Sequence, residues 1–221
     1  MGDLHTGETD LTAYAAWKEC IQLMKPKYIF LHDLFSGVSI SHHTVNNMNL
    51  QVNKPEELDT LQKELDYVGS FLQKISNDFK QQEIIIVKSN HDLFLERYLE
   101  DQRAYKDVVN FKLVIQLAHW YMIEKKNPLE EYIRRKYKID NVTFLSLDQD
   151  FKINRIQLGS HGHLGINGGK SSPRAIEKAY GRATTAHTHS PHILRGTYIV
   201  GTTSRLRLDY NMGPSSWLHA S

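Results

Sequence analysis

An unbroken run of β-branched residues, Ile84-Ile85-Ile86-Val87, constrains the fold of this chain more than any other feature. β-branched side chains favour extended backbone, and polar residues bound the run on both sides. A strand that is apolar at every position has to be buried on both faces, which occurs in parallel sheets that helices cover. The run therefore predicts an interior strand of an α/β sheet.

Helical patterns alternate with further short strands on both sides of this run. Between Pro55 and Phe79, apolar residues recur three and four positions apart, which is typical of an amphipathic helix with Pro55 in its first turn. We expect helices over residues 11–24 and 55–79, over 93–138 in two or three pieces broken near 127–128, and from residue 173. We expect strands over residues 27–31, 84–87, 142–145, 153–158, 184–186 and 198–201. This order predicts a layered α/β fold.

Length and composition are those of an ordinary globular protein. The chain has 221 residues, of which 40% are hydrophobic and 24% charged, and this excludes collagen-like and wholly disordered chains. Its net charge of +2 is too balanced for a histone-like DNA binder. The single cysteine, Cys20, cannot form an internal disulfide and favours a reducing compartment. The apolar runs are too short to span a membrane, and the N-terminal segment is acidic where a signal peptide is basic and then apolar. We therefore expect a cytoplasmic protein.

Potential metal ligands stand where the predicted strands end. Loops at the carboxyl ends of strands are where open α/β sheets bind their ligands. His187 and His189 form the strongest single pair, because alternate residues of an extended segment point to one side and both imidazoles can reach one site. A surface turn would explain any one of these short sequence groups. The prediction of a metal site therefore depends on the number of groups and on their order along the chain. The residues concerned are Asp3, His5, Asp33, Asn90, His91, Asp92, His161, His163, His187 and His189.

The sequence blocks that contain these residues read, in chain order, GDLH, HD, SNHD, HGH and AHTH. This order resembles the signature of the calcineurin-like metallophosphoesterase superfamily, which runs Asp-x-His, Gly-Asp, Gly-Asn-His-Asp/Glu, His, Gly-His-x-His. The resemblance extends from Gly2 to His189. Within the superfamily, Asn-His-Asp resembles the phosphodiesterase and DNA-exonuclease branches, and the tail from Gly201 to Trp217 resembles a segment common in phage-encoded members, some of which degrade DNA. Three glycines of the signature are replaced, by His32, Ser89 and Ala186, which changes the backbone freedom of the loops rather than the ligands. We assign His32 to structure or surface.

The resemblance implies two divalent metal ions bridged by Asp33. One site would be completed by Asp3, His5 and His189. The other would be completed by Asn90, His161 and His187. Imidazole, carboxylate and amide ligands without thiolates suit manganese first, with iron or zinc as alternatives. Two such ions outweigh the charge of the two ligand aspartates, so the site would attract phosphate.

The reaction implied by the resemblance is hydrolysis of a phosphodiester by direct attack of water. His91 matches the family histidine beside the substrate, where an imidazole can protonate the leaving group or stabilise the transition state. Asp92 would orient a neighbouring imidazole. We expect His163, Arg205 and Arg207 to contact the substrate. Nuclease relatives often have a histidine three residues after the bridging aspartate, where this chain has serine.

Three functions fit these residues, whereas a protein phosphatase does not, because the substrate-binding arginine of that branch is missing. The first is a DNA nuclease, since basic side chains that follow or flank the last two metal loops can contact backbone phosphates. The second is a phosphodiesterase for a nucleotide-sized diester, which turnover of small diesters would reveal. The third is a non-catalytic binding scaffold, but such relatives usually lose ligands and this chain keeps them all. The basic residues are Lys170, Arg174, Lys178, Arg182, Arg195, Arg205 and Arg207.

The resemblance also implies two mixed β-sheets sandwiched between helices, in a single domain over residues 1–221 with a helical insertion near 93–138. In this family a hydrophobic strand precedes Asp-x-His, and here only Met1 and Gly2 stand before Asp3. We therefore expect a fragment whose natural polypeptide begins upstream, and a further domain for DNA could follow Trp217. The helical insertion could also form a homo-oligomer contact. A phage-encoded member would act in the host cytoplasm.

Overall fold

The structure, a computed structural model, describes residues 1–41, 52, 54–147, 149–169, 171–208 and 213–217. The chain forms two compact units that alternate along the sequence. The first unit contains residues 1–34, 81–90 and 141–221, and the second contains residues 35–80 and 91–140. The α/β class with two sheets is confirmed, whereas the single domain over residues 1–221 and the layering of sheets between helices stay predictions.

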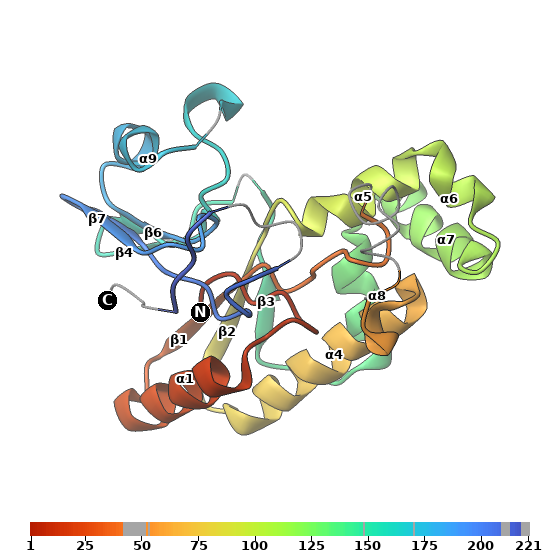
Figure 1. The fold of residues 1–221 in the computed structure, drawn as a ribbon, viewed down its shortest axis with the longest axis horizontal. Helices are drawn as coiled ribbons and strands as arrows, with labels where there is room; N and C mark the ends of the chain where they lie inside the picture. The colour runs from red at the N-terminus through yellow and green to blue at the C-terminus, as the bar shows by residue number, and fades with distance from the viewer. Residues whose placement is uncertain (42–51, 53, 148, 170, 209–212, 218–221) are drawn as a thin grey trace. The chain divides into compact units, whose positions relative to one another are not determined.

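The first unit contains a parallel sheet in the order β1-β2-β3, formed by β1 (Tyr28–His32), β2 (Glu83–Val87) and β3 (Val142–Phe144) (Figure 1). The predicted interior strand is therefore confirmed, and all four of its β-branched residues are buried. The described strands of this sheet pair only in parallel, so the expectation of two mixed sheets is wrong for this one. Long segments with helices connect these strands, as parallel pairing requires.

Residues 1–4 extend the hydrogen bonding of this sheet beyond β1. The carbonyl of Met1 accepts a hydrogen bond from the His32 amide at 3.2 Å, and the Leu4 amide donates to the His32 carbonyl at 3.0 Å. On the opposite side, the Thr203 amide donates to the Gly2 carbonyl at 3.0 Å. The first residues of the chain are thus held between β1 and a segment near residue 203, with backbone groups paired on both sides.

The second sheet, also in the first unit, is mixed and has the order β4-β5-β6-β8-β7. Its strands are β4 (Lys152–Ile153), β5 (Ile156–Gln157), β6 (Ala183–Thr185), β7 (His192–Leu194) and β8 (Thr197–Ile199). The single strand expected over residues 153–158 is wrong, because Asn154 and Arg155 adopt left-handed backbone and turn the chain into the β4–β5 hairpin. The sequence analysis also missed β7, which pairs antiparallel with β8.

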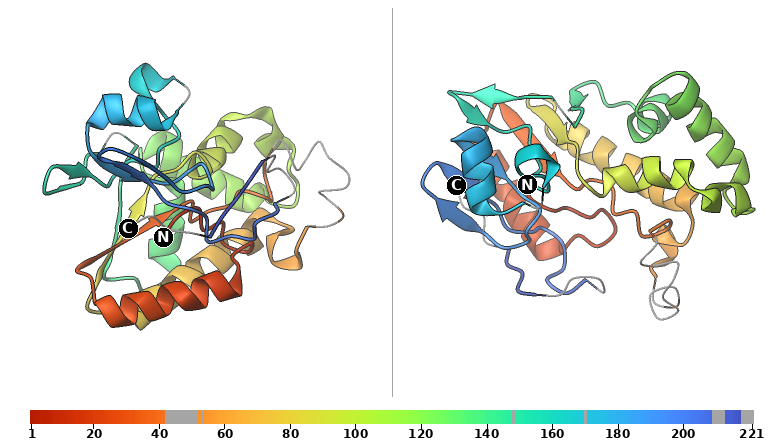
Figure 2. Two further views of the ribbon diagram at one scale, coloured as in Figure 1. Left: turned by 60° about the vertical axis from the view of Figure 1, so that its left-hand side comes forward. Right: turned by 90° about the horizontal axis from the view of Figure 1, so that it is seen from above.

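Two helices belong to the first unit. Helix α1 (Leu11–Met24) has the predicted bounds, and the Asp10 side chain caps its first turn by accepting from the amides of Thr12 and Ala13. Side chains of α1 and β1 line one apolar pocket. Helix α9 (Pro173–Tyr180) packs on the second sheet (Figure 2). Its Ile176 forms a core cluster with Ala183 and Ile199.

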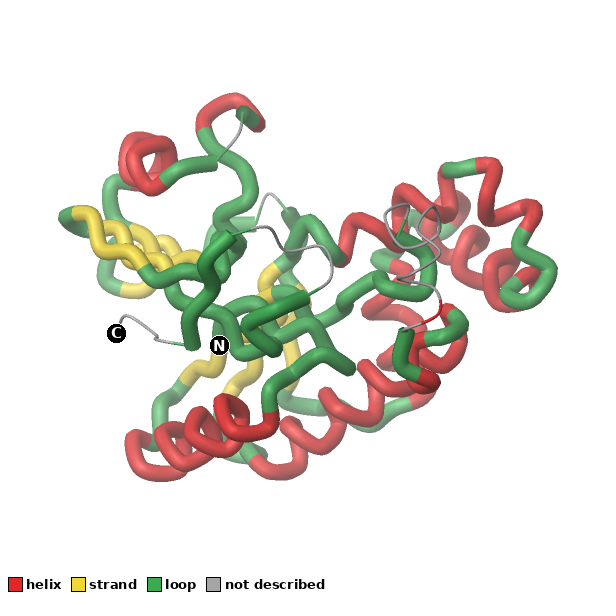
Figure 3. Tube along the Cα trace, viewed as in Figure 1, coloured by secondary structure: helices red, strands yellow, loops and turns green. Residues whose placement is uncertain are grey.

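The regular elements in the described part of the second unit are helices (Figure 3). The single helix expected over residues 55–79, with Pro55 in its first turn, is wrong: η1 (Glu56–Leu58) follows Pro55, and α4 (Leu61–Asp78) is a separate helix that Thr60 caps. Residues 93–138 are helical as expected, but in more than two or three pieces. The apolar stripe of α4 is buried, and the side chain of Asn127 caps the helix that follows the predicted break. Among the described helices, none is long and apolar enough to cross a membrane. The elements are η1 (Glu56–Leu58), α4 (Leu61–Asp78), α5 (Asp92–Glu100), α6 (Gln102–Lys106), α7 (Phe111–Ala118), the π-helix η2 (His119–Ile123) and α8 (Pro128–Lys136).

Candidate metal centre

The predicted ligands of the first unit follow the carboxyl ends of its strands. Asp33 comes directly after β1, and Asn90 comes in the loop after β2. His161 follows β5, and His187 follows β6. Because β1 pairs in parallel with β2, and β5 with β6, the loops of each pair emerge on the same edge of their sheet.

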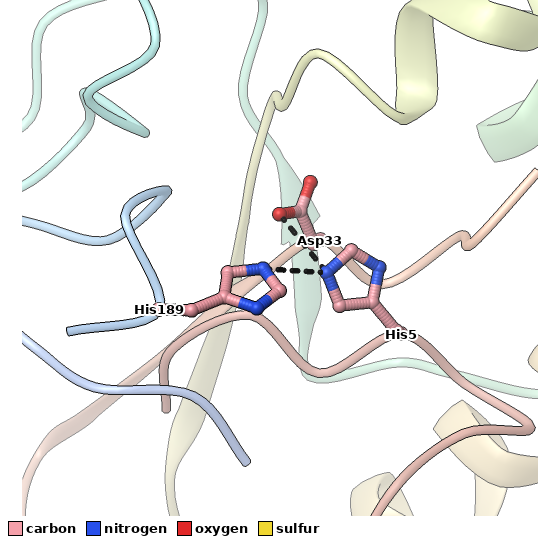
Figure 4. A group of neighbouring side chains, drawn as sticks. All are labelled: His5, Asp33 and His189. Carbon is pink, nitrogen blue, oxygen red and sulfur yellow. Dashed lines mark hydrogen bonds and ion pairs between the residues drawn. The ribbon is translucent and has the colours of Figure 1, made fainter. Parts of the chain in front are cut away.

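Three side chains, His5, Asp33 and His189, form the first group of donor atoms (Figure 4). Nε2 of His5 lies 3.1 Å from Nε2 of His189 and 3.7 Å from Oδ2 of Asp33. All three residues are buried. One donor atom from each lies within 4.8 Å of the others, which is close enough for all three to bind one cation.

Asp33 also belongs to a second group, with Asp3 and His161. Nε2 of His161 lies 3.2 Å from Oδ2 of Asp33 and 3.9 Å from Oδ1 of Asp3. The amide oxygen of Asn90 is 3.1 Å from the same nitrogen. A carboxylate shared between two donor groups is the arrangement that the sequence predicts for Asp33, although Asp3 lies with His161 here and was expected beside His5.

His187 and His163 lie next to these groups. The backbone amide of His187 donates to Oδ1 of Asp3 at 2.9 Å, and the His187 ring centroid is 5.3 Å from that of His161. The His163 ring centroid lies 5.4 Å from that of His161. Both side chains are half-buried. Neither belongs to the two donor groups, so the ligand role of His187 and the substrate role of His163 stay predictions.

The electrostatics of the second group fit a cation. Burial, and after it the negative charge of Asp33, raises the pKa of Asp3 well above its usual range. Oδ2 of Asp3 is buried and has no hydrogen-bond partner within the described part of the chain. Two buried carboxylates side by side are costly without positive charge between them, and a divalent ion supplies that charge. Carboxylate, imidazole and amide donors are also the ligands that manganese or zinc accepts.

The backbone at five predicted ligands lies in the left-handed region, which residues other than glycine rarely adopt. The angle φ is +32° at Asp3, +43° at His5 and +49° at Asp33. It is +76° at His187 and +54° at His189. Such strain persists only where surrounding contacts enforce it, and it concentrates at functional sites. The positive φ at these five predicted ligands is therefore a further observation that favours a functional site here.

Hydrogen bonds from a distant segment hold the backbone at Asp3. The hydroxyl of Thr202 donates to the Asp3 carbonyl at 2.9 Å, and the hydroxyl of Thr203 donates to the Gly2 carbonyl at 2.9 Å. Both threonines are fully buried. Sequence analysis assigned no role to this pair, because the contact joins residues 199 positions apart.

His32, which the sequence analysis assigned to structure or surface, lies beside the second group. Its Nδ1 lies 3.4 Å from Nδ1 of His161, and its side chain is buried. Burial, followed by the proximity of His161, lowers the pKa of His32 well below its usual range. A neutral imidazole at this place can hold the ring of His161 with Nε2 facing Asp33. The available signal was the replacement of a signature glycine by histidine.

The predicted catalytic pair, His91 and Asp92, begins α5 in the second unit. Nδ1 of His91 lies 2.7 Å from the carbonyl oxygen of Ser36, which accepts only, so Nδ1 carries the proton. The ring of Phe94 lies 4.8 Å from the His91 ring, centroid to centroid. Asp92 is buried in the first turn of the helix.

The predicted substrate-binding cations lie at the surface. Arg205 is exposed and its Nη2 lies 3.4 Å from a carboxylate oxygen of Glu8, and Arg207 is exposed as well. Arg195 lies 3.0 Å from Glu177, so its charge is partly neutralised. Arg174, Lys178 and Arg182 are exposed, whereas Lys170 lies outside the described residues.

Comparison with known proteins identifies a phage relative. The chain is similar to Protein A1 of Escherichia phage T5, with 36% identity over 232 aligned positions that cover 98% of this chain. They cover 41% of the phage protein, so the chain spans about two fifths of the length of that relative. No protein-family model matches the chain. No solved structure matches it.

Proposed function

We propose that this chain hydrolyses phosphodiester bonds in DNA with two divalent cations held around Asp33. The observation that carries the proposal is the position of Asp33 in two buried donor groups, one with His5 and His189 and one with Asp3 and His161. A carboxylate shared in this way suits a two-metal site. The order of the ligand blocks, which resembles the metallophosphoesterases, supports the same chemistry.

The residues that would hold the cations are those of the two donor groups together with Asn90 and His187. Manganese suits this set, with iron or zinc as alternatives. When bound, two divalent ions attract the phosphate, make water a better nucleophile and stabilise the charge on the phosphoryl oxygens. The buried positions of Asp3, Asp33 and His161 lower the local dielectric and strengthen each of these interactions.

His91 is proposed to give a proton to the leaving oxygen or to stabilise the transition state. Because its Nδ1–H donates to the Ser36 carbonyl, Nε2 is the nitrogen that can take up or release a proton. The hydrogen bond also fixes the ring in one orientation, as a general acid requires. Asp92 is proposed to orient a neighbouring imidazole.

DNA is proposed as the substrate because of the exposed basic residues and the phage relative. His163 next to the donor groups, together with Arg205 and Arg207, is proposed to contact the substrate. Exposed cations bind backbone phosphates and release counterions, so DNA cleavage should weaken steeply with salt. A phage relative is compatible with a protein that degrades DNA, and the name Protein A1 states no activity.

The test uses metal-depleted protein that is resupplied separately with manganese, zinc or magnesium. We expect manganese to restore cleavage of end-labelled linear or single-stranded DNA, and raising the salt concentration to reduce it more than hydrolysis of a chromogenic diester. The length of the labelled products separates end-wise from internal cutting. Hydrolysis of the diester with intact DNA would favour a nucleotide-sized substrate instead, and no turnover of any phosphoester with any metal would contradict the enzyme proposal.

A further inference from the structure

A buried glutamate organises the loop that follows the Asp33 segment in the second unit. Glu64 lies in α4 and its side chain is fully buried. Its Oε1 accepts hydrogen bonds from the amides of Gly37 at 2.6 Å and Val38 at 3.1 Å, and its Oε2 accepts from the amide of Ser39 at 2.8 Å. One carboxylate thus satisfies three consecutive backbone donors.

This glutamate stands on the apolar face of the helix, between Leu61 and Leu65. Burial raises the pKa of Glu64 to about 7, whereas the hydrogen bonds from Ser39, Gly37 and Val38 favour the carboxylate. A leucine would complete the packing of the helix but would take the acceptor away from three backbone amides, one of them buried. The acid is therefore suited to holding the loop rather than to packing the helix.

Two further contacts hold the same loop. Gly37 has φ of +75°, and a side-chain carbon added there would lie 2.8 Å from the ring of Phe94, so the loop approaches α5 closely. Nη1 of Arg103 donates to the Ile40 carbonyl at 3.0 Å. The loop is thus fixed by α4, α5 and α6, with Glu64 making most of its backbone contacts.

The residue immediately before this glutamate-bound stretch is Ser36, whose carbonyl accepts from Nδ1 of His91. The direction of that carbonyl is set by the conformation of Gly37, whose amide belongs to the same peptide unit. Because the Gly37 amide donates to Glu64, the carboxylate fixes the peptide plane that presents the carbonyl to His91. Phe94, whose ring lies close to Gly37, is also tilted against the His91 ring.

We infer that Glu64 is a positioning residue for His91, because it holds the Ser36–Gly37 peptide that fixes the proton on Nδ1 of the histidine. The inference rests on the proposed function for its catalytic meaning. Its structural part, the coupling of Glu64 to the His91 tautomer, stands without any activity.

The experiment measures the His91 tautomer by long-range proton–nitrogen NMR on the ¹⁵N-labelled full chain at pH 8, above the pKa of Glu64. The spectrum of His91→Gln assigns the His91 signals. We expect the Nδ1–H tautomer in the parent chain, a loss of most of that population in Glu64→Ala and a smaller loss in Glu64→Gln, which keeps one acceptor oxygen. Glu57→Ala, at an exposed position of the same unit, is the matched control and should leave the signals unchanged.

Unchanged His91 signals in both folded Glu64 variants would overturn the inference. If Glu64→Ala fails to fold by circular dichroism, Glu64→Gln alone decides, because its smaller loss is still expected. In the same variants, kcat for DNA cleavage should fall on the order of 10- to 100-fold with KM little changed. A tautomer change without any turnover in the parent chain would keep the coupling and contradict only the proposed function.

Discussion

Asp33→Asn is expected to abolish the binding of both metal ions. Asparagine offers a neutral oxygen where two donor groups share a carboxylate, so both sites lose their common negative ligand at once. Removing a residue that only hydrogen-bonds to a metal ligand lowers metal affinity by roughly 10- to 100-fold. Because Asp33 is itself a proposed ligand, the loss in metal affinity should be larger. Manganese should then no longer raise the melting temperature, whereas it raises that of the parent chain.

The apoprotein provides the control for this prediction. Without metal, Asp33 raises the pKa of Asp3 by charge repulsion, so removing the Asp33 charge should leave the apoprotein at least as stable as the parent chain. Asp140→Asn, which removes an exposed carboxylate, is the matched variant and should keep the manganese effect. If Asp33→Asn bound two ions with parent affinity, the shared role of Asp33 would be wrong.

His91→Gln is expected to lower kcat by a factor of roughly 10² to 10⁴, the range for loss of a general acid or base, with metal binding unchanged. Glutamine keeps an N–H donor for the Ser36 carbonyl, so the loop contact can remain while proton transfer is lost. The measurement compares DNA with a diester whose leaving group departs without protonation.

The ratio of the two substrates decides the role of His91. A general acid should matter more for DNA than for the diester with the good leaving group, because the latter needs less proton transfer. An equal fall on both substrates would assign His91 to stabilising the phosphoryl charge instead. Parent-like rates on both substrates would contradict any catalytic role, and loss of metal would place His91 among the structural supports of the site.

The sequence predicts the fold where a residue pattern extends over several helical turns, or where a run of residues is uniformly β-branched. Helix α1 is predicted to the residue by its helical composition and by Pro26 after its end, and the buried strand β2 by its uninterrupted β-branched run. The β4–β5 hairpin was missed because Asn154 and Arg155 turn the chain without glycine or proline. The short strand β7 presents two exposed residues and carries no burial pattern that sequence analysis could use.

The candidate site could be predicted as a set of residues but not as a geometry. The resemblance implies that Asp33 is shared between two metal sites, and the structure has Asp33 in two groups of donor atoms. The grouping of Asp3 with His161, and the contact of His32 with His161, depend on loops far apart in the sequence. The sequence does not indicate a role for Glu64, because a glutamate in an amphipathic helix usually faces solvent, whereas Glu64 lies among the buried apolar residues of α4. Ligand roles, metal identity and catalysis stay predictions.

The most direct test of the two-metal claim is a crystal structure of the chain grown with manganese, with anomalous scattering used to locate the metal. We expect two peaks roughly 3.5–4 Å apart, both bonded to the Asp33 carboxylate. One should also be bonded to His5 and His189, and the other to Asp3 and His161. A single peak, or peaks whose ligands do not include Asp33, would contradict the account.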